Sequence, residues 1–253
     1  IKMTNLILIK KLRQKTGCGI ADCNKALKEC SDNLEDAVTW LRKKGLSSAA
    51  KKSGRTAAEG LIGIHVSDNK ASMVEINSET DFVAKNDKFQ KFVELVTKTA
   101  IEIDKKLPYE NFAEELKNLT LKDSIKKISE ELIDKISVIG ENLNIRKGVT
   151  MKIDEDGTIV QYLHNKVGDM FGKIGVLVSL KSKADKTKLQ EIGKKIAMHI
   201  AATKPDFLAI KDVNPERLNK EKEILAEQAR KSGKPENIIE KIIQGRIRKF
   251  YEE

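Results

Sequence analysis

The spacing of apolar residues in the first part of the chain predicts helices. Apolar positions recur at helical intervals from Leu6 to Lys15, from Ala21 to Cys30 and from Leu34 to Lys44. A TGCG peptide separates the first two segments, and Ser31-Asp32-Asn33 supplies turn and cap residues before the third. We therefore expect a compact three-helix unit. The small-residue-rich stretch 45–60 that follows is either a linker or a weak helix.

From Leu61 the hydrophobic period changes to that of a strand. The segments LIGIHVS and ASMVEIN, joined by the polar Asp68-Asn69-Lys70, predict a β-hairpin. The peptide NSETDFVAKND, residues 77–87, follows the second strand directly, and a helix is predicted after it, from Phe89 to about Lys106. This peptide is therefore a connection from a strand to a helix, and it carries a phenylalanine among polar neighbours.

Further elements follow in a similar order. Pro108 to Leu119 predicts a short helix, and five apolar residues predict one face of a longer helix: Leu121, Ile125, Ile128, Leu132 and Ile136. A second cycle then has strands at Leu143–Ile153, Thr158–Leu163 and Ile174–Leu180, and a helix from about Asp185 to Thr203. Because the order of hairpin, loop and helix occurs twice, we expect two related α+β subdomains with helices packed on antiparallel sheets.

The last part of the chain predicts an antiparallel helical hairpin. Asn214-Pro215 starts a charged helix that runs to about Lys231, Ser232-Gly233-Lys234-Pro235 reverses the chain, and a second helix runs to the end. Each arm has one apolar stripe, which is typical of an arm that contacts another surface. The expected fold is α+β, with a three-helix N-terminal domain (1–45), a linker (46–59), two core subdomains (60–140 and 141–210) and the hairpin (211–253).

The composition is that of a globular protein, with 253 residues of which 40% are hydrophobic and 34% charged. The longest apolar runs, such as IGVLVSL, are much shorter than the roughly 18 residues of a membrane helix, and the first residues lack a secretory cleavage site. We therefore expect a cytoplasmic protein. Cys18, Cys23 and Cys30 have no CxxC pair and no neighbouring histidine, so we expect reduced, buried thiols.

The formal net charge of +10 raises the alternative of an RNA-binding translation accessory protein. The lysines, however, are spread along predicted helix faces among nearly as many carboxylates, and aromatic residues make up only 4%. A solvated surface that attracts acidic partners explains the charge better. We expect no direct binding to nucleic acid and none to membranes.

Signatures of catalysis are missing from the sequence. There is no GxSxG elbow, and GDMFGKI at 168–174 lacks the glycine spacing and the Ser or Thr after Lys173 that a phosphate loop needs, so it predicts a tight turn. Gly17-Cys18-Gly19 follows a predicted helix instead of a strand, which argues against a dinucleotide fingerprint. We expect no catalytic residue, no cofactor and no metal, and a protein that is not an enzyme.

Several peptides, in order and spread over nearly the whole chain, closely resemble bacterial elongation factor Ts. They are LRQKTGCGIADCNKAL, AAEGLI, NSETDFVAKND, IGENLNIR, HIAA with Pro205, and SGKPENIIEKIIQGRIRKF. The resemblance implies a guanine-nucleotide exchange factor for elongation factor Tu, the GTPase that delivers aminoacyl-tRNA to the ribosome. It also implies a ubiquitin-associated-like first domain, a two-part core and a coiled-coil arm, which allows a homodimer or a 2:2 complex.

The family's TDFV motif corresponds to Thr80-Asp81-Phe82-Val83 in this sequence. The resemblance implies that the phenylalanine enters an apolar pocket of the GTPase near its magnesium site. Phe82 is therefore expected to act as a wedge that promotes GDP release. For Asp81 two roles stay open, which are perturbing the water around the magnesium ion and capping the following turn.

The resemblance implies further contacts with the GTPase. Arg13, Ile20, Ala21 and Lys25 match a segment of the first domain that touches it, and His164 matches an interface histidine. For Arg13, Lys25 and His164 the alternative is an ordinary surface position, and for His65 and His199 we expect structural roles.

The sequence also departs from the family pattern. Asn24 stands where the family usually has lysine, and Ile20-Ala21 replaces a methionine pair, which predicts weaker or rearranged contacts of the first domain. The family ordinarily continues beyond the position of Phe250-Tyr251 with more core structure. Two explanations stay open, which are a truncated sequence and a segment that is dispensable here, and the completeness of the second core subdomain stays open with them.

Overall fold

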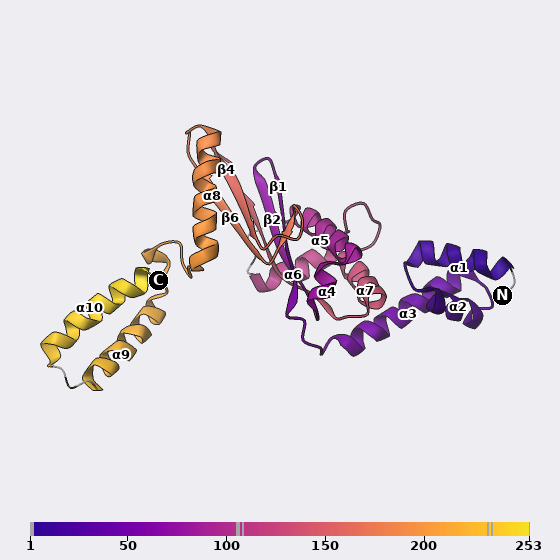
Figure 1. Ribbon diagram of the computed structural model, residues 1–253, viewed down its shortest axis with the longest axis horizontal. Helices are drawn as coiled ribbons and strands as arrows, with labels where there is room; N and C mark the ends of the chain where they lie inside the picture. The colour runs from indigo at the N-terminus through magenta and orange to yellow at the C-terminus, as the bar shows by residue number, and fades with distance from the viewer. Residues whose placement is uncertain (1–2, 105–106, 108, 232, 234, 253) are drawn as a thin grey trace. The chain divides into compact units, whose positions relative to one another are not determined.

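The computed structural model describes residues 3–104, 107, 109–231, 233 and 235–252. The chain forms two compact units, residues 1–198 and 199–253. The first combines helices with antiparallel sheets, and the described part of the second is helical (Figure 1). The predicted α+β class, with antiparallel sheets and a helical N-terminal region, is confirmed.

Three helices form the N-terminal region: α1 (Met3–Thr16), α2 (Ile20–Glu29) and α3 (Leu34–Lys52). They enclose a small core that consists of Ile9, Leu12, Cys23, Ala26, Leu27, Ala37 and Leu41. Gly17, between α1 and α2, has a φ of +69°, a turn conformation that favours glycine. Asn33 caps α3, because its side chain accepts hydrogen bonds from two backbone N–H groups of the first turn. Local signals therefore separate these helices where the sequence predicts.

The third helix is longer than predicted. It continues to Lys52, beyond the predicted end at Lys44, so the weak-helix interpretation of the small-residue stretch is correct up to that point. Gly45 lies against helix α7 (Ile128–Ile139), and a Cβ at this glycine would be 3.7 Å from Cβ of Ser137. Packing against α7 thus stabilises a segment that has no wide apolar stripe of its own.

The central sheet has four strands in the order β3-β2-β1-β5, and its neighbouring strands are antiparallel. They are β1 (Glu59–Ser67), β2 (Lys70–Ser78), β3 (Leu143–Lys152) and β5 (Phe171–Gly172). The predicted hairpin is confirmed, since β1 pairs with β2 over the full length of both strands. A smaller antiparallel sheet consists of β4 (Gly157–His164) and β6 (Ile174–Lys181).

Two strands differ from the prediction. The segment 143–153, assigned to a second cycle, instead forms β3 and pairs with β2. Without it β2 would expose a row of unpaired backbone groups, and Leu143 and Ile145 are buried in the core that β2 also lines. Phe171–Gly172, predicted to belong to a tight turn, pairs with β1. The two sheets are therefore unequal.

Four helices pack with the central sheet: α4 (Asp81–Ala84), α5 (Asp87–Ala100), α6 (Tyr109–Asn118) and α7. All five apolar positions that predicted α5 are buried: Phe89, Phe92, Val93, Val96 and Ala100. They share one core with strand residues such as Leu61, Val74 and Ile76. The prediction that this helix runs to about Lys106 is wrong, because α5 ends at Ala100 and the backbone N–H of Ile103 donates to the carbonyl oxygen of Ala100 in a turn. Lys106 itself and the predicted start of the next helix at Pro108 lie outside the described residues.

The helix predicted from Leu121 starts later. Thr120 forms a β-bridge with Lys127, and this bridge uses backbone groups that a helix through the segment would need. Helix α7 therefore begins only at Ile128. Leu121 is buried, but Ile125 is 99% exposed in the loop. The helical spacing of these two residues with α7 was misleading.

Helix α8 (Lys186–Thr203) confirms the helix predicted after the last strand. Gly193 on α8 faces the smaller sheet, because a Cβ there would lie 2.4 Å from Cγ2 of Val160. The side-chain amide of Gln190 also donates a hydrogen bond to the Thr158 hydroxyl at 2.6 Å. This helix therefore covers β4 at close range.

The second unit contains a 3-10 turn, η1 (Ile210–Asp212), and two helices, α9 (Pro215–Lys231) and α10 (Glu236–Glu252). The two helices form an antiparallel hairpin, as predicted (Figure 1). Its buried side chains include Leu225, Ala229, Ile239 and Ile247. Ser232 and Lys234 of the predicted chain reversal lie outside the described residues.

Replacing Gly60 by alanine should destabilise the central sheet by about 2–4 kcal/mol. Gly60 has a φ of +128°, and an added Cβ would lie 2.2 Å from the backbone carbonyl oxygen of Ile76 on β2. Urea unfolding measures the loss. Gly54→Ala is the control, since no atom lies within 4 Å of its Cβ position, and it should change stability by less than about 0.5 kcal/mol. Equal stabilities of the two variants would contradict the close approach of Gly60 to the backbone of β2.

Candidate functional site

The connection predicted between strand and helix is a tight corner, residues 79–86, between β2 and α5. At its centre α4 makes a single helical turn. Phe82 on this turn is 77% exposed, whereas Val83 and Ala84 are 6% and 2% exposed and join the central core. The corner thus presents a phenylalanine ring to solvent and anchors the two residues after it. Val83 anchors the turn that carries Phe82 through the protein's own core, and its predicted contact with a partner stays a prediction.

Thr80 fixes the start of the corner through all its polar groups. Its backbone N–H donates to Oε2 of Glu141 at 2.9 Å, and its hydroxyl donates to Oε1 of the same carboxylate at 2.6 Å. Its carbonyl oxygen accepts a hydrogen bond from the Ser78 hydroxyl at 2.9 Å. Bonds to an ionised carboxylate are stronger than those between neutral groups. The backbone just before Phe82 is therefore held by the loop after α7.

Glu79 forms a second link between the corner and the loop after α7. Its Oε1 accepts a hydrogen bond from the backbone N–H of Asn142 at 2.6 Å and lies 3.4 Å from the guanidinium of Arg55. The side-chain amide of Asn142 in turn donates to the carbonyl oxygen of Arg55 at 2.8 Å. The end of β2, the loop after α7 and the segment after α3 consequently meet at one point.

The other end of the corner is held by Asn86. Its backbone N–H donates to the carbonyl oxygen of Val83 at 2.9 Å. Its side-chain oxygen accepts from the N–H groups of Lys88 and Phe89 at 2.9 and 3.3 Å, which caps α5. The turn that carries Phe82 is therefore fixed at both ends.

Asp81 lies beside Phe82 and is exposed. The N-cap position of α4 is Thr80, and no side chain caps this turn. The capping role considered for Asp81 is therefore not observed. Within the described part of the chain its carboxylate has no hydrogen-bond or ion-pair partner, so it is available to an incoming group.

The end of β2 is tied to both neighbouring strands. Oε1 of Glu75 accepts hydrogen bonds from Arg146 on β3 at 2.8 Å and from the amide of Asn77 at 3.2 Å, and Lys147 lies 3.5 Å from Oε2. The amide of Asn77 also donates to the carbonyl oxygen of Glu59 on β1 at 3.1 Å. Burial alone raises the pKa of Glu75, but these hydrogen bonds and the two positive charges outweigh it and leave the pKa below its usual value.

The other predicted contact residues lie away from the corner in the chain. His164 is exposed at the end of β4, with Nδ1 3.1 Å from the hydroxyl oxygen of Tyr162, and no hydrogen bond or ion pair among the described residues joins it to the corner. The four predicted N-terminal residues are all exposed: Arg13 on α1, and Ile20, Ala21 and Lys25 on α2. The structure brings together only the TDFV residues.

Comparison with known proteins identifies the family. The sequence profile of a family described as Elongation factor TS matches residues 79–253, a range that begins at the corner. Elongation factor Ts of Rhodospirillum centenum is 49% identical over 246 residues, which are 97% of this chain and 78% of that protein. The proteins of the same name from Rhizobium johnstonii and Sinorhizobium fredii are 48% and 47% identical with the same coverage. The chain belongs to the elongation factor Ts family.

Membership of the elongation factor Ts family gives the chain a role in translation elongation. Glu79 of the corner and Glu141 of the loop after α7 were not predicted as site residues, although both lie in peptides that carry the family resemblance. Their partners are remote in sequence, because 61 positions separate Thr80 from Glu141 and 63 separate Glu79 from Asn142. Hydrophobic spacing does not report such pairs. In the sequence, each is an acidic residue just after the end of a strand or helix, inside a peptide that carries the family resemblance.

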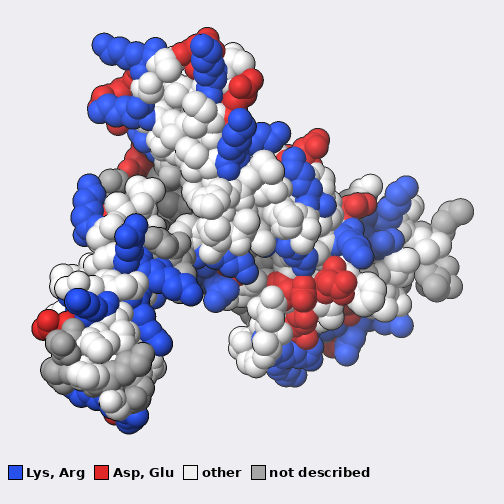
Figure 2. Space-filling view, turned by 60° about the vertical axis from the view of Figure 1, so that its left-hand side comes forward, with Lys and Arg blue, Asp and Glu red and all other residues white. Residues whose placement is uncertain are grey.

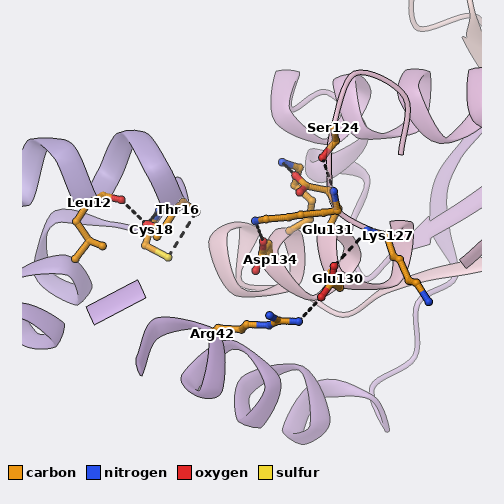
Figure 3. Close-up of polar contacts among 11 residues, drawn as sticks. Leu12, Thr16, Cys18, Arg42, Ser124, Lys127, Glu130, Glu131 and Asp134 are labelled. Carbon is orange, nitrogen blue, oxygen red and sulfur yellow. Dashed lines mark hydrogen bonds and ion pairs between the residues drawn. The ribbon is translucent and has the colours of Figure 1, made fainter. Parts of the chain in front are cut away.

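A groove of about 600 Å³ separates the three-helix region of this elongation factor Ts chain from α7. Figure 3 shows the ion pair between Arg42 and Glu130 that spans it. Lys126 pairs with Asp134 at 2.6 Å, and although burial lowers the pKa of Lys126, the hydrogen bond and charge of Asp134 raise it above its usual value. These charges are paired, and the described residues contain no cluster of metal-binding side chains.

The surface charge of this elongation factor Ts chain is mixed. On the face shown in Figure 2, basic side chains are scattered over the surface and acidic side chains lie among them. Some ion pairs join residues of the same helix, such as Lys98–Glu94 on α5 and Lys135–Glu131 on α7. The two signs of charge are therefore intermingled on this face. Among the helices in the described ranges, none has both the length and the apolar character to cross a bilayer.

Replacing Glu75 by glutamine should make stability less sensitive to acid. A carboxylate with a lowered pKa in the folded state stabilises the fold above its unfolded-state pKa of about 4.3, and the contribution is lost as pH falls through the folded-state value. Urea unfolding between about pH 7 and pH 3 should show a smaller loss for Glu75→Gln than for the wild type. Glu114→Gln, which removes a more exposed ion pair with Lys117, should follow the wild type. Identical acid profiles for Glu75→Gln and wild type would contradict this role.

Proposed function

We propose that this protein promotes the release of GDP from elongation factor Tu, and that Phe82 couples its binding to that release. The proposal places no chemical step in the protein itself, which acts by contact alone. Family membership supports the partner, because elongation factor Ts proteins resemble this chain over nearly its whole length. The observation that carries the mechanism is the exposed phenylalanine on a corner fixed at both ends.

The exposed ring supplies binding energy to a partner. Burying a phenylalanine side chain is favourable by roughly 1.5–3 kcal/mol relative to leaving it in water. Phe82 is 77% exposed in this chain, so most of that energy is still available. Because the backbone on both sides is hydrogen-bonded, little of it is lost in ordering the turn on binding.

Release of the nucleotide follows if the ring fits only one state of the GTPase. In that case Phe82 enters an apolar pocket whose open form disturbs the magnesium and phosphate site. Binding of this protein then lowers the affinity of the GTPase for GDP, and bound GDP lowers the affinity of the GTPase for this protein by the same ratio. Each 1.4 kcal/mol or so of this coupling changes the affinity about tenfold.

Further contacts complete the proposed interface. We propose that the Asp81 carboxylate, which is exposed beside the ring, perturbs the water around the magnesium ion of the GTPase. His164 is proposed to contact the GTPase from the smaller sheet. Four exposed residues of the three-helix region are proposed to bind a separate part of its surface: Arg13, Ile20, Ala21 and Lys25.

Replacing Phe82 by alanine should slow the stimulated release of a fluorescent GDP analogue from elongation factor Tu by about ten- to a hundredfold, the range that loss of ring burial implies. Stopped-flow fluorescence with and without the factor measures this rate. The free energy of unfolding should change by less than about 0.5 kcal/mol, because the ring makes few contacts within its own chain.

Ile125→Ala provides the matched control. It also removes an exposed apolar side chain, 99% exposed, from a loop of the same core. It should release nucleotide at the wild-type rate. A Phe82→Ala protein that is as active as the control would rule out the wedge.

A further inference from the structure

The turn that carries Phe82 cannot hold itself in place. Helix α4 has only four residues, and a single helical turn is unstable without outside contacts. On one side Val83 and Ala84 are buried in the core. On the other side the backbone of Thr80 is bonded to Glu141 and to Ser78. The direction in which the ring points therefore depends on what holds Thr80.

Glu141 uses both carboxylate oxygens on this one residue. Oε2 accepts from the Thr80 N–H at 2.9 Å and Oε1 accepts from the Thr80 hydroxyl at 2.6 Å. A threonine at an N-cap ordinarily uses its oxygen to accept a bond from the first helical turn. Here that cap bond is not made, and the hydroxyl donates to Glu141 instead. The start of the turn is thus held by a neighbouring loop and not by its own cap.

The position of Glu141 is in turn fixed by its own surroundings. Helix α7 is anchored in the central core through Ile128, Leu132 and Ile136. It ends at Gly140, whose φ of +88° turns the chain out of the helix. Asn142, the residue after Glu141, is 8% exposed and bonded to both Glu79 and Arg55. The carboxylate is therefore presented to Thr80 from a rigid frame.

We propose that Glu141 is a positioning residue for nucleotide exchange, which acts through Thr80 by holding the Phe82 ring in the direction that enters the partner. This inference rests on the proposed function and names a residue of the same site. Glu141 itself does not need to touch the GTPase. Its effect on exchange should therefore exist only while the ring is present.

The decisive experiment is a double-mutant cycle of Glu141→Ala and Phe82→Ala, with release of a fluorescent GDP analogue from elongation factor Tu as the readout. In the wild-type background Glu141→Ala should lower the maximal release rate about tenfold, because the turn is no longer held in one direction. In the Phe82→Ala background the same change should lower it less than about twofold. Glu131→Ala is the control, since that carboxylate on α7 bonds Lys135 on its own helix, and it should release at the wild-type rate.

A second readout needs no partner. In the free protein, amide hydrogen exchange of Thr80 should become at least about tenfold faster in Glu141→Ala, because its N–H loses its acceptor. Thr80→Val removes only the hydroxyl and should lower the rate of GDP release several-fold. Thr80→Ser keeps the hydroxyl and should release GDP at close to the wild-type rate. These variants keep the test open if Glu141→Ala is too unstable to use.

The outcomes separate the two proposals. Equal losses from Glu141→Ala in both backgrounds would show a general structural role and overturn the positioning role. Normal release by Glu141→Ala and Thr80→Val, with Phe82→Ala defective, would overturn the positioning role and leave the proposed function standing. Normal release by Phe82→Ala would overturn the proposed role of Phe82, and the positioning role with it, whatever the hydrogen exchange of Thr80, whereas no stimulation of release by the wild type would overturn the proposed function itself.

Discussion

The two hydrogen bonds from Thr80 to the Glu141 carboxylate are the constraint on which the corner depends. They join the end of a strand to the loop after a helix, and the two residues are 61 positions apart in the sequence. Since a four-residue helix has no stability of its own, its geometry is set by these bonds and by the burial of Val83 and Ala84. Phe82 is exposed because the two residues after it occupy the core.

This arrangement resolves a conflict between stability and binding. A large apolar side chain left in water contributes nothing to folding, and on a loose loop it would lose much of its binding energy to ordering. The carboxylates of Glu79 and Glu141 remove that loss. Glu141 accepts a hydrogen bond from the backbone of Thr80 in the corner, and Glu79 accepts one from the backbone of Asn142 in the loop after α7. The same polar bonds that shape the fold therefore set how strongly the exposed ring can act on a partner.

The parts of the fold that depend on local signals were predictable. The β1–β2 hairpin follows from period-two spacing, α5 from five apolar positions, and the exposed Phe82 from its polar neighbours. The errors involve pairings that hydrophobic spacing does not report. Pairing with β2 decides where β3 lies and contact at Gly45 extends α3, whereas a local bridge between Thr120 and Lys127 delays α7. Glu141 was missed for the same reason, since its role is visible only once Thr80 is beside it.

The distance along the chain between the two halves of the corner also has a consequence for biosynthesis. A ribosome must add Glu141 and Asn142, and then β3, before the strand end at Ser78, which already pairs with β1, can acquire its remaining neighbours. Closing so long a loop is slow compared with forming a hairpin or a helix. A nascent or prematurely terminated polypeptide that stops short of Gly140 thus displays the TDFV peptide without its frame. The frame around Phe82 is therefore complete only after β3 has been synthesised.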